Sequence, residues 1–163
     1  MTVTIRPATA AEFPTLAELC VTAYAPFVGG DHEYVAVLRD VASRAEAAEL
    51  LVATSGDGRL LGTVTYVPEG GPLGEIAGPR EAEFRMLAVD PSARGLGVGT
   101  ALLRRILDES RRRGRTGVVC SSLPEMRAAH RIYARLGFTR APERDWSPLP
   151  GVDLLAFAIP LAA

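Results

Sequence analysis

A glycine-rich turn between an apolar strand and a helix constrains this chain more than any other segment. The strand pattern over residues 83–89 gives way to helical periodicity after three glycines at alternate positions between residues 95 and 99. Because glycine has no side chain, backbone N–H groups at the start of the helix can approach an anion closely. The helix dipole adds to the charge of Arg94. The segment therefore predicts a pyrophosphate-binding turn.

The spacing within this turn is a poor fit to two familiar phosphate loops. A Walker loop requires a lysine after its last glycine, whereas all 18 basic residues of this chain are arginine. A dinucleotide fingerprint requires a third glycine at the position held by Thr100, and it normally opens the first strand-turn-helix unit of a chain. Both nucleotide sites are therefore disfavoured.

Length and charge set the broad class of the protein. A chain of 163 residues is expected to form one domain, residues 1–163, and to bury about two thirds of its unfolded surface. The formal net charge of -1 gives no overall field that would favour nucleic acid or an anionic membrane. The arginine run at residues 111–115 is interpreted as a solvated helix end, where the helix dipole favours cations. We expect neither nucleic acid nor membrane as a partner.

Two further features bear on location and metal binding. Residues 1–7 have neither a basic nor an apolar leader region, and the apolar stretch 154–163 is too short to span a bilayer, so we expect a cytoplasmic protein. Cys20 and Cys120 lack the spacing of a metal site or disulfide framework. They are expected to be buried thiols, and no metal site is predicted.

Periodicity predicts the element order β-α-α-β-β-β-α-β-α-β-β. Strands are expected at 3–6, 50–54, 60–67, 83–89, 116–121 and 152–159, with a short strand after residue 138 and helices at 9–24, 31–41, 98–113 and 124–136. The first strands are joined by a hairpin at residues 55–58, and later strands alternate with helices. This pattern is typical of an α/β protein whose mixed, mostly antiparallel sheet is flanked by helices on both faces.

The turn also resembles a family signature. Arg94, Gly97 and Gly99 match the Arg-x-x-Gly-x-Gly pattern of the GNAT superfamily of N-acetyltransferases, and the element order is similar over nearly the whole chain. The resemblance implies a GNAT-like fold and acetyl-CoA as cosubstrate. It assigns the pyrophosphate to a loop that comprises Arg94, Gly95, Leu96, Gly97, Val98, Gly99 and Thr100.

The resemblance further implies a splayed strand before this loop. In the family, free backbone groups of that strand bind the pantetheine arm, and by position these belong to Leu87, Ala88 and Val89. The N–H of Leu87 or Ala88 is then expected to meet the thioester oxygen. An ordinary buried strand would have the same apolar side chains.

Tyr133 is the expected general acid. Residues 129–138 are similar to the Ala-x-x-x-Tyr-x-x-x-Gly-Phe segment of the family, although Met126 stands where the family often has asparagine. A phenol with an ordinary pKa of about 10 can protonate the leaving thiolate. The alternative is a core tyrosine with a satisfied hydroxyl.

Glu83 is the expected general base, by its position at the head of the cofactor strand, where histone-type members carry a glutamate. A partly desolvated carboxylate there could take the proton of the amine directly or through water. The alternative is an exposed strand-end charge paired with Arg85 or Arg80. His32 is kept as another candidate base, whereas His130 is expected at the surface, pointing away from Tyr133.

These residues predict acetyl transfer from acetyl-CoA to a primary amine by direct attack in a ternary complex. Cys120 has no charged neighbour to activate it, so no acyl-cysteine step is expected. The alternative is a non-catalytic acyl-CoA sensor or interaction module, which would bind acetyl-CoA without turnover.

The acceptor is expected between the loops at 24–33, 69–79 and 141–151. The candidate walls of its site are Tyr24, Phe27, His32 and Trp146. Either a small-molecule amine or a peptide amine fits this mixture of aromatic and acidic residues. Homodimers are common in the family, so a homodimer is also considered.

Overall fold

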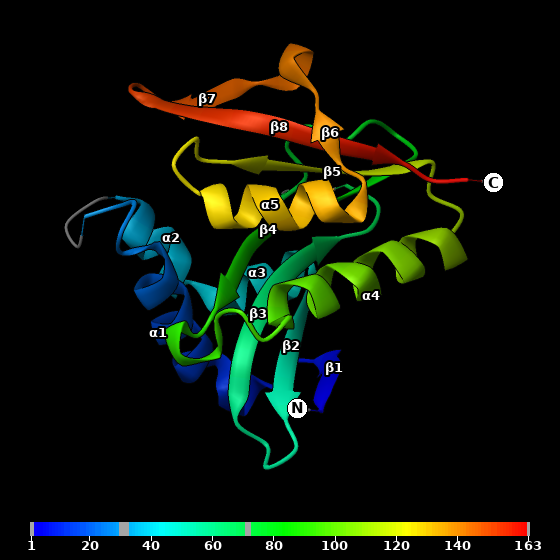
Figure 1. Cartoon of the computed structure of the whole chain (residues 1–163). Coiled ribbons are helices and arrows are strands. Elements are labelled where there is room, and N and C mark those ends of the chain that lie inside the picture. Colours follow the sequence, from blue (N-terminus) through cyan, green and yellow to red (C-terminus); the bar gives the residue numbers. More distant parts are fainter. Residues whose placement is uncertain (1, 30–32, 71–72, 163) are drawn as a thin grey trace.

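A mostly antiparallel sheet forms the centre of the protein in a computed structural model that describes residues 2–29, 33–70 and 73–162 (Figure 1). The strand order is β1-β2-β3-β4-β5-β8-β6, with β7 paired to β8. Among the strands of the described residues, only β4 and β5 pair in parallel. The strands are β1 Val3–Pro7, β2 Glu49–Ser55, β3 Leu60–Val67, β4 Glu81–Val89, β5 Gly117–Ser122, β6 Thr139–Arg140, β7 Trp146–Leu149 and β8 Val152–Pro160.

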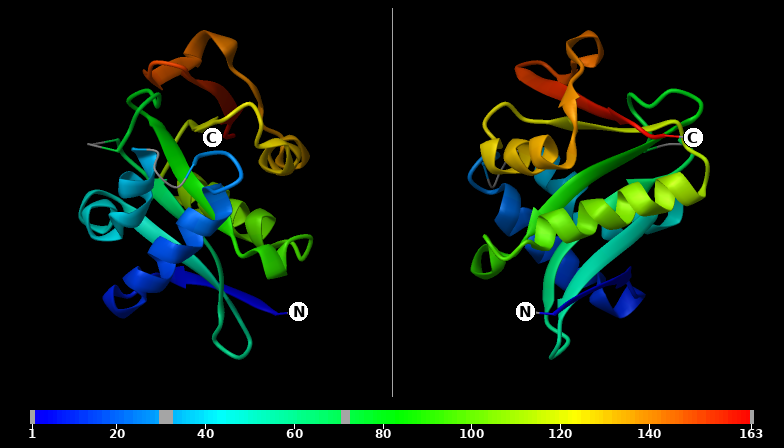
Figure 2. Two further views of the ribbon diagram at one scale, coloured as in Figure 1. Left: turned by 90° about the vertical axis from the view of Figure 1, so that its left-hand side faces the viewer. Right: turned by 45° about the vertical axis from the view of Figure 1, so that its right-hand side comes forward.

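Helices cover both faces of this sheet, as the patterning predicted. The helices are α1 Phe13–Tyr24, α2 Tyr34–Arg39, α3 Val41–Ala47, α4 Val98–Arg112 and α5 Arg127–Leu136. Figure 2 shows α4 and α5 on one side of the sheet and α1 to α3 on the other. Each side has its own apolar core, and Cys20 and Cys120 are buried in these two cores as predicted.

The N-terminal helices differ in one respect from the sequence prediction. The capping box of Thr9 and Glu12 is present and precedes α1. However, the helix expected to continue to residue 41 divides at Asp40, whose carboxylate caps α3. Buried Arg44 donates to the carbonyls of Val37 and Leu38 at 2.5 and 3.1 Å, so it satisfies the end of α2. Two short helices therefore replace the single expected helix.

The C-terminal part also contains a strand that the sequence did not predict. Residues 141–151 were expected to be a loop, but Trp146 pairs with Leu154 and forms β7 beside β8. Pro148 is compatible with β7 because an edge strand leaves one side without a hydrogen-bonding partner. The expected start of α5 at Pro124 was also wrong, since this helix begins at Arg127.

The β4 and β5 strands separate part of the way along their length. Their parallel register runs from Glu81 opposite Gly117 to Phe84 opposite Cys120, after which β4 continues beside β3 alone. A β-bulge shifts the β3–β4 register in the same region, and Met86 there has a φ of 56°, which is rare for a residue with a side chain. Figure 1 shows the C-terminal ends of β4 and β5 diverging.

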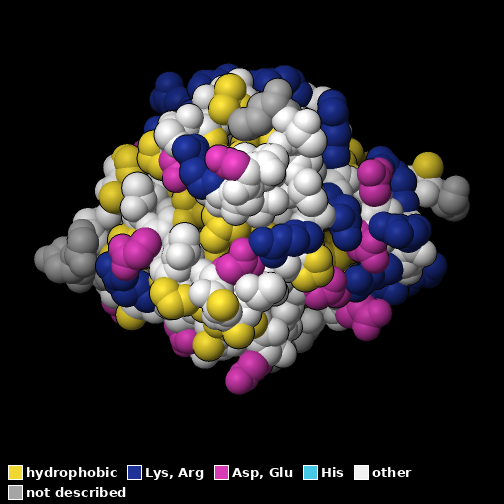
Figure 3. Space-filling view, turned by 90° about the horizontal axis from the view of Figure 1, so that it is seen from below, with side chains coloured by type: hydrophobic (Ala, Val, Ile, Leu, Met, Phe, Trp, Pro, Cys, Tyr) yellow, Lys and Arg dark blue, Asp and Glu magenta, His cyan; other side chains and the backbone are white. Residues whose placement is uncertain are grey.

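The arginine run at the end of α4 is paired with carboxylates. Arg111 contacts Asp108, Arg112 contacts Glu109, and Arg113 contacts Glu49 at 2.7 Å. In Figure 3, basic and acidic side chains are interspersed on the right-hand side of the molecule. This agrees with a solvated helix end. Within the described ranges, no helix has both the length and the apolar character required to cross a bilayer.

Candidate active site

The glycine turn forms an open cradle at the start of α4. Gly95 and Gly97 have φ angles of 78° and 81°, a conformation that costs glycine little. A Cβ at either position would have no atom of the described residues within 4 Å. The first helical N–H bond runs from Ala101 to the Gly97 carbonyl at 3.0 Å. The N–H groups of residues 97–100 therefore point out of the helix end without helical acceptors.

The third glycine of the turn has another role. A Cβ on Gly99 would lie 2.9 Å from Cδ1 of Ile132, so this glycine allows α4 to pack closely against α5. Val98 is buried, whereas Leu96 is 53% exposed and Arg94 is also exposed. Arg94 and the free N–H groups together suit an anion such as a pyrophosphate.

The β4 strand leads directly from a cavity to this cradle. Arg85 and Met86 line the cavity, and Leu87, Ala88 and Val89 follow on the part of β4 that has separated from β5. Ala88 and Val89 pair with β3 on the other side. The separated edge can therefore bind an extended chain.

Tyr133 lies on α5 beside the ends of these strands. Its side chain is 4% exposed and packs against Phe84 and Phe157, with ring centroids 5.7 and 5.2 Å away. The Ser122 and Cys120 side chains are close enough to the hydroxyl to affect its pKa. Burial raises the pKa of Tyr133 well above its ordinary value, so the phenol stays protonated.

The expectation that His130 lies at the surface and points away from Tyr133 was wrong. His130 is half-buried, its ring centroid is 6.0 Å from that of Tyr133, and its Nε2 lies 3.0 Å from the Ser122 hydroxyl. Residues three apart on a helix are neighbours, which explains the contact. Burial lowers the pKa of His130.

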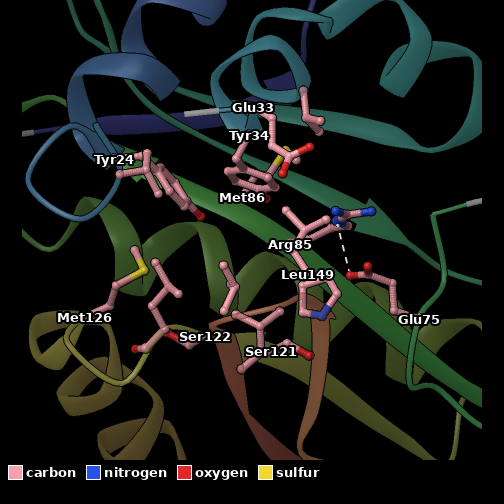
Figure 4. Close-up of a pocket in the computed structure, with 16 residues that line it drawn as sticks. Tyr24, Glu33, Tyr34, Glu75, Arg85, Met86, Ser121, Ser122, Met126 and Leu149 are labelled. Carbon is pink, nitrogen blue, oxygen red and sulfur yellow. Dashed lines mark hydrogen bonds and ion pairs between the residues drawn. The ribbon is translucent and has the colours of Figure 1, made fainter. Parts of the chain in front are cut away.

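A cavity of about 290 Å³ opens between α1, α2, β4, β5 and the β7–β8 hairpin (Figure 4). Its walls are mostly apolar, with serine hydroxyls at the β5 end. The lining residues are Tyr24, Val28, Glu33, Tyr34, Val37, Glu75, Arg85, Met86, Ser121, Ser122, Leu123, Met126, Pro148, Leu149, Val152 and Leu154. Ser122 lines this cavity, and its hydroxyl lies 3.0 Å from Nε2 of His130.

Two charged residues of this cavity, Glu75 and Arg85, were not identified as site residues from the sequence. Arg85 Nε lies 3.6 Å from Glu75 Oε1, and Glu33 lines the same cavity. Burial raises the pKa of Glu75, as does the nearby charge of Glu83, while Arg85 opposes this effect. An arginine within the apolar run of residues 84–89 was the available signal, because a charge inside a strand requires a partner.

Glu83 is buried, with 1% exposure, and does not line the cavity. The alternative of an exposed strand-end charge paired with Arg85 or Arg80 is therefore wrong. Instead, Glu83 Oε1 accepts hydrogen bonds from the backbone N–H groups of Glu75, Ile76 and Ala77 at 2.9 to 3.0 Å. The assignment of Glu83 as general base stays a prediction.

The four expected acceptor walls lie in different environments. Tyr24 is buried and lines the cavity, whereas Phe27 is 37% exposed and does not line it. Trp146 reaches the site indirectly, since its Nε1 donates to the hydroxyl of Ser121 at 2.9 Å. His32 lies outside the described residues.

Comparisons with known proteins agree with this geometry. A model of the acetyltransferase (GNAT) family matches residues 15–138. An uncharacterized N-acetyltransferase of Schizosaccharomyces pombe is 32% identical over 103 residues, which cover 63% of this chain and 59% of that protein. The chain spans less than two thirds of the length of the first curated relatives that it matches.

Solved structures show the same fold. A GNAT-family acetyltransferase from Staphylococcus aureus has a TM-score of 0.78 at 14% identity, over 99% of this chain and 100% of that one. The protein yncA from Salmonella typhimurium, solved with its cofactor acetyl-CoA, has a TM-score of 0.68 at 23% identity, over 99% and 95% of the two chains. The predicted α/β fold class is confirmed. Because the family match extends from α1 through the cradle to Phe138, this chain belongs to the GNAT family of acetyltransferases.

Proposed function

We propose that the protein transfers an acetyl group from acetyl-CoA to a primary amine by direct attack, with both substrates bound together. The observation that carries this proposal is the separation of β4 from β5 after Phe84. Along β4, the cavity-lining residues, the free edge and the cradle follow one another without interruption. The acceptor and the acetyl donor can therefore meet at one strand.

The residues of the cradle suit the donor. Arg94 and the free N–H groups of residues 97–100 would hold the pyrophosphate, since the helix end is positive and open. Backbone groups of Leu87, Ala88 and Val89 would hold the pantetheine arm. An N–H of Leu87 or Ala88 would stabilise the negative charge that develops on the thioester oxygen.

Tyr133 would provide the proton for the leaving thiolate. Burial raises its pKa, and the same desolvation makes a neighbouring thiolate more basic, as it does for Cys120. Burial therefore makes the thiolate a stronger base at the same time as it makes the phenol a weaker acid. Ser122, between Tyr133 and the cavity, would keep the hydroxyl oriented.

The protons balance over the whole reaction. The attacking nitrogen loses one proton to a base as the new C–N bond forms, and the sulfur gains one from Tyr133 as the C–S bond breaks. A proton then returns to Tyr133 from solvent. Glu83, predicted from the resemblance, is one candidate for the base.

A thiol-release assay with saturating acetyl-CoA and a panel of primary amines tests this proposal. We expect amine-dependent thiol release and an acetylated product of matching mass. Binding of acetyl-CoA by calorimetry without thiol release for any amine would contradict it and would favour the non-catalytic sensor. Light scattering of the same preparations measures the oligomeric state and would detect a homodimer.

A further inference from the structure

The segment that joins β3 to β4 carries a carboxylate into the cavity. Glu75 is in this segment, and its side chain lines the cavity beside Arg85 (Figure 4). The contact between them is an ion pair of 3.6 Å rather than a hydrogen bond, and Arg85 Nε has no hydrogen-bond partner among the described residues. Both side chains retain some exposure, 21% for Glu75 and 16% for Arg85. The Glu75 carboxylate therefore remains available to a molecule in the cavity.

Glu83 fixes the backbone that carries Glu75. One oxygen of Glu83 accepts three consecutive N–H groups, those of Glu75, Ile76 and Ala77. This acceptor is buried on a central strand, where water does not compete for its hydrogen bonds. Residues 75–77 are therefore attached to β4 at one point.

The surrounding charges favour a cationic amine in this cavity. Glu75 faces Arg85 and Glu83 on β4 and the Tyr34 hydroxyl on α2, and Glu33 lines the same space. Among the lining residues, two carboxylates and one guanidinium leave a formal charge of −1. Burial raises the pKa of Glu75, which brings a carboxylate closer to the range in which it can accept and release a proton.

We propose that Glu75 is the general base for the acceptor amine and that Glu83 acts as its positioning residue. This proposal rests on the acetyltransferase function proposed above. The cationic amine first loses one proton to solvent through Glu75, which leaves an electron pair on nitrogen. As the C–N bond forms, Glu75 takes the second proton, directly or through one water molecule, and the electron pair of that N–H bond stays on nitrogen. Tyr133 protonates the sulfur, and Glu75 releases its proton to solvent. The acceptor is accordingly a compact primary amine with an apolar body, since the rest of the cavity wall is largely apolar.

Two isosteric variants separate the roles of the carboxylates. Glu75→Gln removes the base, so kcat should fall at least about a hundredfold while the Kd for acetyl-CoA stays unchanged. Glu83→Gln retains an oxygen that accepts the three N–H groups, so kcat should fall less than about tenfold. Glu69→Gln, an exposed glutamate in the same connecting segment, is the matched control and should retain full activity.

A double variant tests the positioning role. Glu83→Ala frees residues 75–77, so kcat should fall while the Kd for acetyl-CoA and the circular dichroism spectrum stay unchanged. In the Glu75→Gln background, Glu83→Ala should cause almost no further loss, because Glu83 acts through Glu75. Independent, multiplicative losses would overturn the positioning role.

The outcomes distinguish this inference from the proposed function. If the wild type is active and Glu75→Gln retains its kcat within about threefold, the Glu75 assignment is overturned and the acetyltransferase stands. A larger loss in Glu83→Gln than in Glu75→Gln would return the base to Glu83. Absence of thiol release by the wild type with every amine would overturn both.

Discussion

Replacing Gly97 by alanine should weaken acetyl-CoA binding far more than it weakens the fold. Gly97 caps α4 with a φ of 81°, and a Cβ there would extend into the open cradle, with no described atom within 4 Å. The new side chain therefore meets no protein atom. In the proposed complex it would occupy the space of the pyrophosphate beside the N–H groups of the helix end.

The backbone sets the cost in stability. The left-handed conformation costs a residue with a Cβ about 1 to 2 kcal/mol, and in a protein of this size each kcal/mol lowers Tm by about 2 to 4 °C. We therefore expect Tm to fall by about 2 to 8 °C for Gly97→Ala. We expect the Kd for acetyl-CoA to rise at least about tenfold, equivalent to about 1.4 kcal/mol.

Gly114 provides a matched control beyond the other end of α4. It has a φ of 71°, and a Cβ there would also meet no described atom within 4 Å. The 15 residues of α4 separate it from the cradle by about 22 Å. Gly114→Ala should therefore lower Tm by a similar amount without any change in Kd.

Differential scanning fluorimetry gives Tm, and isothermal titration calorimetry gives Kd for both variants. If Gly97→Ala binds acetyl-CoA as tightly as the wild type does, the cradle does not hold the pyrophosphate. Equal losses of affinity in both variants would instead show that destabilisation alone reduces binding.

Three further perturbations follow from the structure. Tyr133→Phe should lower kcat at least about a hundredfold, measured by thiol release, with an unchanged Kd for acetyl-CoA. Gly62→Ala should destabilise the protein by about 1 to 3 kcal/mol in urea unfolding, because a Cβ there would lie 2.8 Å from Cγ1 of Val98. Hydrogen bonding to Arg140 lowers the pKa of Asp145 to about 2, so Asp145 stabilises the fold above the ordinary carboxyl pKa and loses this effect as pH falls towards 2. The stability difference between wild type and Asp145→Asn should therefore shrink between about pH 4 and pH 2.

Each of these three predictions would be contradicted by a specific result. Full activity of Tyr133→Phe would remove the phenol from the mechanism, and wild-type stability of Gly62→Ala would show that α4 can move away from β3. A stability difference for Asp145→Asn that is constant with pH would mean that the ion pair makes no net contribution.

The main elements could be predicted because their signals are local. The capping box at Thr9 and Glu12 lies within four residues, and the β3 strand was predicted with the bounds that the structure has. The missed strand, β7, is different, since Trp146 becomes a strand residue only by pairing with Leu154. The four residues of β7 include a proline and are too few for their hydrophobic periodicity to predict this pairing.

The candidate site was predictable only in part, for the same reason. The glycine turn and the segment around Tyr133 are contiguous motifs, so a family resemblance could locate them. Glu75 and Arg85 lie ten residues apart in different elements, and only the sheet brings them to one cavity. Glu83 was expected to act on substrate, but its contacts in the fold are three backbone N–H groups.

By itself, the sequence determined the α/β class, the element order around the glycine turn and the identity of the family. These depend on patterns of apolar residues, glycines and helix caps. Such patterns act between residues that are close together in the sequence, so they can be recognised without the tertiary structure. Only the tertiary structure decided where β4 separates from β5, which side chains line the cavity, and which carboxylates face it. Those features arise from contacts between distant segments, and the bulge at Met86 shows that such contacts can override what a strand sequence favours locally.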